Sequence, residues 1–377
     1  MFSIFKIFFA LGWVSFGGPA AHIGYFRHSF VEKRAWLTDK EYADFVALSQ
    51  FLPGPGSSQV GFAIGYHKGG LPGAICAFLG FTLPSMFLML LLAAVSHHFI
   101  NTPIFEQLVH GLKLLAVVVV ADAALGMYQN FCRSKITITL CAASAVALLV
   151  APSMTMQITV LIFSALIGTT LLNTPEHKAI RFKPNYFALS VFGLLLIIPA
   201  LFFQSSPINQ IFNAFFQTGS LVFGGGHVVL PLLQHSLGEQ ISEELFITGY
   251  SAAQAVPGPM FSLATFLGYQ LASDFALIGA LTATIAVFLP GFLLLLVVLK
   301  HWASLAQHSK VAGALKGVNA CVVGLLISAL YQPVYVTAVH NPIDIALIII
   351  GWYLFKTLKL PILALVGFYL VCGLTVL

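Results

Sequence analysis

The stretch QFLPGPGSSQ, Gln50–Gln59, lies inside an apolar region and returns in altered form as QAVPGPMFS, Gln254–Ser262. Proline lacks a backbone N–H and breaks the interior of a helix, and glycine adopts conformations that other residues avoid. Two Pro-Gly-Pro breaks, each in the middle of an apolar segment, therefore predict broken helices and an internal repeat.

The repeat extends in both directions from these breaks. Ile4–Gly18 placed over Ile211–Gly225 gives eight identities in fifteen positions without a gap. Further along the chain, the matching pairs are Leu83-Pro84 with Leu289-Pro290 and Leu112-Lys113 with Leu315-Lys316. Because the matches keep their order, we predict two homologous halves, residues 1–173 and 208–377, joined by a linker, residues 174–207, that contains one transmembrane helix.

The composition indicates a membrane protein. Of the 377 residues, 59% are hydrophobic and only 8% are charged, against about a quarter charged in an ordinary soluble domain. A bilayer crossing takes about 20 apolar residues. The long apolar stretches are Leu71–Val95, Pro103–Met127, Lys135–Pro152, Tyr186–Phe203 and Ala272–Lys300. We therefore predict an all-α polytopic membrane protein whose surroundings are the lipid bilayer.

Several classes of function are disfavoured. The net charge of +5 is dispersed, so we expect no nucleic acid partner. The five cysteines form no CxxC, and the twelve histidines show no metal-ligand spacing, so we expect no metal and no cofactor. A membrane-embedded lipid-modifying enzyme would need a nucleophile–base set, and no GxSxG appears. The sequence leaves homo-oligomerisation open.

The charges of the two halves are opposed. The segment Arg27–Lys40 carries four basic residues, whereas its counterpart Gln234–Glu244 has no lysine or arginine and three glutamates. Basic loops favour the cytoplasmic side, so this reversal predicts an inverted-topology repeat, an architecture of secondary transporters. If Phe2–Ser29 and Thr38–Tyr66 are re-entrant hairpins, the chain has nine crossings and four hairpins. Its N-terminus is then cytoplasmic and its C-terminus periplasmic.

The broken helices supply the candidate substrate site. Non-helical backbone at membrane depth is tolerated where protein or a water-filled cavity receives it. Each helix that restarts after a break points unpaired N–H groups and its positive dipole end inward, which suits an anion. The expected tip residues are Gly17, Gly18, Pro53, Gly54, Pro55, Gly224, Gly225, Gly226, Pro257, Gly258 and Pro259. The neighbouring hydrogen-bonding side chains are Gln50, Ser57, Ser58, Gln59, Gln254 and Ser262. Kinks in packed helices are the alternative explanation.

A few ionisable residues lie in apolar segments. Lys113 and Lys316 fall at the same place of the repeat alignment, and each is a candidate charge for an anion, with snorkelling to an interface as the alternative. Asp122 breaks the symmetry and would pair with a cation or couple protons. The remaining candidates for the pathway or for coupling are Glu106, His110, His22 and His227; the last two are equally explained as packing residues.

These motifs resemble the chromate ion transporter (CHR) family. The likeness rests on Phe16–Pro19, Gln50–Gln59, Phe81–Ser85, Phe223–Gly226, Gln254–Pro259 and Phe288–Gly291, in this order over nearly the whole chain. The resemblance implies a long, two-domain member that exports chromate across the bacterial inner membrane and confers resistance. One departure is Met260-Phe261, where the first half has Gly56-Ser57; we expect unequal contributions from the two halves.

Physics allows export but leaves the cargo open. A dianion leaving a negative-inside cell gains about 4–5 kcal/mol per 100 mV, so membrane potential alone could drive it, and proton motive force is the alternative. Chromate and sulfate share charge and shape. Sulfate or another tetrahedral oxyanion therefore remains the competing substrate.

Overall fold

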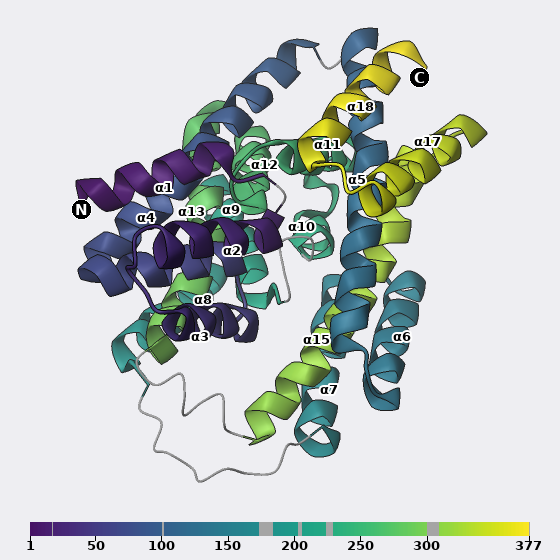
Figure 1. Cartoon of the computed structure of the whole chain (residues 1–377). Coiled ribbons are helices and arrows are strands. Elements are labelled where there is room, and N and C mark those ends of the chain that lie inside the picture. The colour runs from purple at the N-terminus through teal and green to yellow at the C-terminus, as the bar shows by residue number, and fades with distance from the viewer. Residues whose placement is uncertain are drawn as a thin grey trace.

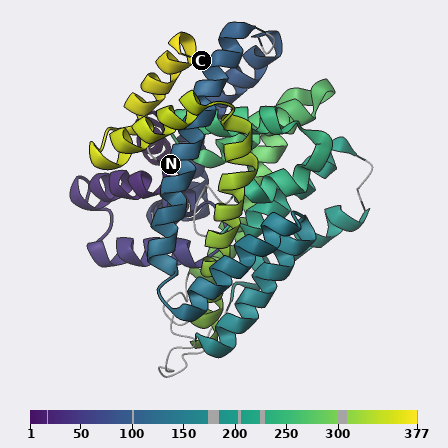
Figure 2. The ribbon, with the colours of Figure 1, turned by 90° about the vertical axis from the view of Figure 1, so that its right-hand side faces the viewer.

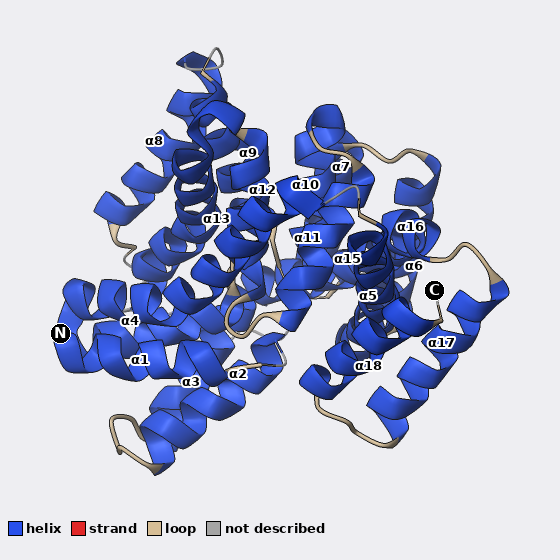
Figure 3. Cartoon of the chain, turned by 90° about the horizontal axis from the view of Figure 1, so that it is seen from above, coloured by secondary structure: helices blue, strands red, loops and turns tan. Residues whose placement is uncertain are grey.

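The computed structural model describes residues 1–16, 18–99, 102–172, 184–202, 206–223, 229–299 and 309–376, and every regular element in these ranges is helical (Figures 1 and 3). In the first half the helices are α1 (Phe2–Val14), α2 (Gly18–Arg27), α3 (Asp39–Phe51), α4 (Gly56–Phe99), α5 (Pro103–Phe131), α6 (Lys135–Val150) and α7 (Met154–Leu171). The linker contributes α8 (Tyr186–Phe202). In the second half they are α9 (Pro207–Leu221), α10 (Val229–Leu237), α11 (Glu243–Ala255), α12 (Leu263–Leu271), α13 (Ala276–Val298), α15 (Ser309–Ala329), α16 (Val336–Ala338), α17 (Pro342–Trp352) and α18 (Ile362–Thr375). The expected all-α polytopic architecture is confirmed.

Four stretches of described helix are long and apolar enough to cross a membrane: Gly56–Val95, Glu106–Phe131, Ala276–Val298 and Ser309–Ala338. Several others, including α6, α8 and α18, are apolar but shorter. Apolar side chains are exposed along one face of α4, at Leu71, Ile75, Leu79, Leu83 and Phe87, which suits contact with lipid. The total of nine crossings stays a prediction, because short helices fix no membrane boundary.

In the first half, α4 restarts after the predicted Pro-Gly-Pro break and contains a second interruption that the sequence analysis does not predict. α4 is interrupted at Gly69 and Gly70, whose backbone angles are not helical, and Gly70 has a positive φ of 61°. The part before this interruption follows the Pro-Gly-Pro break, and the part after it begins at Leu71, the first residue of a predicted crossing. α3, which precedes the break, starts with Thr38 as its cap: the Thr38 side chain and Glu41 form a reciprocal capping box.

Corresponding helices of the two halves pack in corresponding ways. α1 packs on α4, and α9 packs on α13. The contact is close in both cases because a glycine faces a carbonyl. A Cβ atom at Gly12 would lie 2.7 Å from the Phe81 oxygen, and one at Gly219 would lie 2.3 Å from the Val287 oxygen. Any side chain at either glycine would push the helices apart.

The C-terminal helices of each half pack on the long helix of the other half. α6 and α7 pack on α15, while α17 and α18 pack on α5, and α5 and α15 lie against each other (Figure 2). Glycines again set the distance: a Cβ at Gly317 would lie 2.0 Å from the Ser164 oxygen, and one at Gly111 would lie 2.2 Å from the Tyr369 oxygen. The largest hydrophobic core cluster contains residues of both halves. Each half is therefore completed by helices of the other.

Candidate anion site at the helix breaks

The two Pro-Gly-Pro breaks are tied to the opposite half by one backbone hydrogen bond each. The Gly54 N–H donates to the Val222 oxygen at 2.6 Å, and the Gly258 N–H donates to the Ser15 oxygen at 2.9 Å. Both acceptors lie just after the last residue of the preceding broken helix, α9 and α1 respectively. Each Pro-Gly-Pro break is therefore held against the end of a broken helix of the opposite half.

Both break glycines are required by geometry. Gly54 has φ +121° and Gly258 has φ +98°, conformations that residues with a side chain rarely adopt. The space is also filled: a Cβ at Gly54 would lie 2.8 Å from Gly291 Cα, and one at Gly258 would lie 3.1 Å from Ser85 Oγ. The sequence expectation that glycine is needed at these two tips agrees with this geometry.

Buried polar atoms without a hydrogen-bond partner gather beside the breaks. Among the predicted site residues they are Ser58 Oγ, Gln59 Oε1 and Ser262 Oγ, and the neighbouring Ser15 Oγ and Thr82 Oγ1 also have no partner. A buried polar group without a partner costs free energy. The free donors among these are the hydroxyl groups, which come from both halves, whereas Gln59 Oε1 is an acceptor.

The Gln59 side chain is oriented by the break itself. Its Nε2 donates to the Pro53 oxygen at 2.9 Å and to the Gly291 oxygen at 3.0 Å, and the residue is fully buried. Two carbonyl acceptors fix which end of the amide is the donor. Gln59 therefore braces the first break against α13 of the other half.

Ser57, in contrast, is already engaged. The His22 ring lies on α2, with Nδ1 3.2 Å from Ser57 Oγ and Nε2 3.1 Å from the Ser15 oxygen. His22 thus contributes to packing and positioning, one of the two roles expected for it. In the second half, Phe261 stands at the position of Ser57, and it is buried. The Met260-Phe261 departure therefore replaces a structural hydroxyl, and Ser58 and Ser262 remain at matching positions, three residues after their Pro-Gly-Pro.

Not every candidate lies with this group. Gln50 is exposed, whereas its counterpart Gln254 is buried. Gly18 begins α2 with φ +73°. Pro55, Pro257 and Pro259 flank the breaks that their sequence positions predict. The remaining tip candidates, Gly17, Gly224, Gly225, Gly226 and His227, lie outside the described residues.

Lys113 and Lys316 have different surroundings, which corrects their predicted equivalence. Lys113 is buried, and its Nζ lies 3.0 Å from Glu244 Oε1 on α11, whereas Lys316 is exposed. The close contacts at Gly111 and Gly317 make these two glycines equivalent, so Lys113 corresponds to Asn319. The alignment that placed Lys113 over Lys316 is therefore shifted by three residues, nearly one helical turn.

The other ionisable candidates on α5 also have partners or exposure of their own. Asp122 pairs with Lys356 at 2.5 Å rather than with Lys113. His110 Nε2 lies 3.1 Å from Asp344 Oδ1 and 3.1 Å from the Ala338 oxygen. Glu106 is exposed in the first turn of α5. Glu244 and Asp344 were not predicted as site residues, and only their position in contact with a first-half side chain identifies them.

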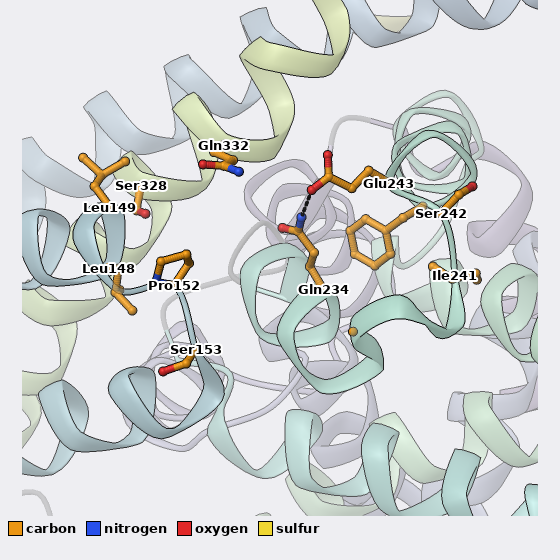
Figure 4. Close-up of a pocket in the computed structure, with 12 residues that line it drawn as sticks. Leu148, Leu149, Pro152, Ser153, Gln234, Ile241, Ser242, Glu243, Ser328 and Gln332 are labelled. Carbon is orange, nitrogen blue, oxygen red and sulfur yellow. Dashed lines mark hydrogen bonds between the residues drawn. The ribbon is translucent and has the colours of Figure 1, made fainter.

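A cavity of about 650 Å³ lies between the halves, beside the start of α11 (Figure 4). Its polar lining comes from Gln234, Glu243 and Ser242 on one side and from Ser153, Ser328 and Gln332 on the other. Gln234 Nε2 donates to Glu243 Oε1 at 3.3 Å (Figure 4). None of the predicted substrate-binding residues that the structure describes lines it. Glu243, which lines the cavity, immediately precedes Glu244, the partner of Lys113, on α11.

Comparison with known proteins identifies the family. The sequence pattern of the chromate transporter family matches residues 2–169 and again residues 209–376. The chain belongs to the chromate transporter family. The resemblance that the motifs indicated is thus confirmed, as is the two-part, long-chain organisation of the match.

Known relatives are similar to this chain over most of their own length. The chromate transport protein of Cupriavidus metallidurans is 26% identical, over 96% of this chain and 90% of its own. A probable chromate transport protein of Synechococcus elongatus is 25% identical over 96% and 92%. An uncharacterized transporter of Methanocaldococcus jannaschii is 28% identical over 86% and 82%. No solved structure gives a significant match.

Proposed function

We propose that this chain exports chromate from the cytoplasm across the bacterial inner membrane, and that the meeting point of the helix breaks binds the oxyanion. One observation carries the proposal: the buried, unpartnered hydroxyls of Ser58 and Ser262, one from each half, lie beside two breaks that are each held by a backbone hydrogen bond to the opposite half. The family membership supports chromate as the cargo.

The binding chemistry needs no fully charged side chain. The helix parts that follow the breaks, at the start of α4 and of α12, direct backbone N–H groups and the positive end of a helix dipole towards the breaks. Hydroxyl donors add hydrogen bonds to an anion, and hydrogen bonds with a charged partner are the stronger kind. A neutral site of this type binds a dianion and still releases it, as transport requires.

The direction and the energy follow from the membrane potential. An anion that leaves a negative-inside cell moves down the electrical gradient and gains about 2.3 kcal/mol per charge per 100 mV. Coupling to protons is then an addition rather than a requirement. The topology is tested with reporter tags after Lys33 and after Glu239, which we expect on opposite sides; tags on one side would refute the inverted repeat.

Sulfate is the second candidate substrate, because the donors beside the breaks contact oxygens and not the central atom. The discriminating measurement is chromate uptake into everted membrane vesicles with unlabelled sulfate as competitor. Strong competition indicates a general tetrahedral-oxyanion transporter.

The decisive experiment is the same uptake with and without an imposed membrane potential. In everted vesicles, export from the cytoplasm appears as uptake, and a positive interior should accelerate it. If uptake equals that of vesicles lacking the protein both with and without the potential, chromate export is refuted. Uptake that follows a pH gradient and ignores the potential would refute the potential as energy source.

A further inference from the structure

Matching helices of the two halves are packed unequally. α11 packs against α5, whereas its counterpart α3 packs on α4 and has no comparable contact with α15 among the described residues. The correspondence of α3 and α11 is fixed by their caps, since Thr38 caps α3 and Ser242 caps α11. The long helix α5 is therefore covered by α11, whereas the long helix α15, in the part of the chain that the structure describes, is not covered by α3.

The residues at the closed contact have identifiable counterparts at the open one. Glu244 is the second residue after the Ser242 cap, and Lys40 is the second after the Thr38 cap. Lys113 and Asn319 are equivalent because Gly111 and Gly317, two positions earlier, face carbonyls of matching helices. In the other half, Asn319 and Lys40 therefore occupy the positions that correspond to Lys113 and Glu244.

The chemistry of this second pair is complementary. Asn319 Oδ1 is buried and has no hydrogen-bond partner. Lys40 is exposed on α3. An ammonium group has three donors and no acceptor, which suits an unpartnered amide oxygen. We propose that Lys40 and Asn319 form a second gate, closed when α3 packs on α15, and that it alternates with the Lys113–Glu244 gate seen closed here.

The first gate is able to open because one of its two partners is exposed. The Glu244 side chain is 74% exposed, whereas that of Lys113 is 8% exposed. Glu244 can therefore move away into its polar surroundings, and the buried Lys113 then needs water or another anion as its partner. The inference rests on the proposed transport function and on the inverted topology, under which the Lys113–Glu244 gate faces the periplasm and the open side faces the cytoplasm.

The test is cross-linking in membranes, in full-length protein whose five native cysteines are replaced by alanine. Two pairs are compared: Lys113→Cys with Glu244→Cys, and Lys40→Cys with Asn319→Cys. A short, reducible bifunctional thiol reagent is applied, and chromate uptake is measured before cross-linking, after it, and after reduction. Lys33→Cys with Asn319→Cys is the matched control, because Lys33 is exposed before α3 and has no place in the gate.

We expect each of the two gate pairs to cross-link in its own variant. Each cross-link should abolish uptake, and reduction should restore it. The control pair should not cross-link. A Lys40–Asn319 pair that never cross-links, or cross-links no more than the control, overturns the proposal. So does a variant carrying all four cysteines in which both links form in one molecule. Cross-linking does not depend on the cargo. If both pairs cross-link while the wild-type protein moves no chromate, the gate proposal is supported and the proposed function is refuted.

Discussion

Removing the hydroxyl of Ser58 should weaken substrate binding without weakening the fold. Ser58 is 3% exposed and its Oγ has no partner, so Ser58→Ala removes no hydrogen bond from the empty protein. In the occupied protein the hydroxyl donates to an anion. A hydrogen bond with a charged partner contributes about 1.5–3 kcal/mol, which corresponds to an increase in KM of about 10- to 150-fold.

The same calculation gives the sign of the stability change. A buried polar group without a partner costs about 1–3 kcal/mol, and therefore Ser58→Ala should leave the unfolding temperature of the empty protein unchanged or slightly raised. Ser262→Ala should behave in the same way, since Ser262 Oγ is equally buried and unpartnered. Because both hydroxyls would contact one ligand, the double variant is expected to lose more affinity than either single variant.

The assay is chromate uptake into everted vesicles over a range of concentrations, with thermal unfolding of the purified protein followed in parallel. Ser49→Ala is the matched control. Ser49 is also buried, near the same break, but its Oγ donates to the Val46 oxygen within its own helix at 2.8 Å. A wild-type KM for Ser58→Ala and Ser262→Ala would refute the placement of the substrate at the breaks.

Two further predictions concern glycines. Gly54→Ala should abolish uptake for two reasons. At a φ of +121° the backbone of any residue with a side chain is strained by about 1–3 kcal/mol, and the added Cβ would lie 2.8 Å from Gly291 Cα. Gly238→Ala, with φ +52° and open space, should retain uptake; equal activity of the two variants would contradict the reasoning. Gly317→Ala should lower the unfolding temperature, because its Cβ would lie 2.0 Å from a carbonyl oxygen on α7, and overpacking costs about 1–3 kcal/mol. Gly126→Ala, with nothing within 4 Å, should not, and a shift shared by both would disprove the packing explanation.

The helix breaks could be predicted because proline and glycine act locally. The ends of α3 and α11 and the restarts at α4 and α12 lie where the Pro-Gly-Pro motifs place them. The polar residues that follow could be predicted for the same reason, since they occupy the first turn of a restarting helix. Partners across the two halves could not: the contact of Gly54 with Val222 and of Lys113 with Glu244 joins segments far apart in the chain.

The register of the long helices was the least predictable feature. Val117–Val120 on α5 and Val322-Val323 on α15 give an alignment few landmarks. A shift of three residues turns a helix by nearly one full turn and keeps the apolar pattern almost intact. The alignment of Lys113 with Lys316 therefore fits the apolar pattern, although it is shifted by three residues. Packing resolved the register, because only glycine permits the close approach at Gly111 and Gly317.

The unequal Pro-Gly-Pro motifs then acquire a different meaning. Judged from sequence, Met260-Phe261 deprives the second half of a hydroxyl and makes the site lopsided. In the structure, the lost hydroxyl is the one that Ser57 uses for His22. Val229 stands where His22 stands in the first half, and both Val229 and Phe261 are buried. A polar pair behind the break has been exchanged for an apolar pair, and the unpartnered hydroxyls of Ser58 and Ser262 are left in equivalent places. The asymmetry thus belongs to the support of the proposed site, while the serine donors that would contact the oxyanion are balanced.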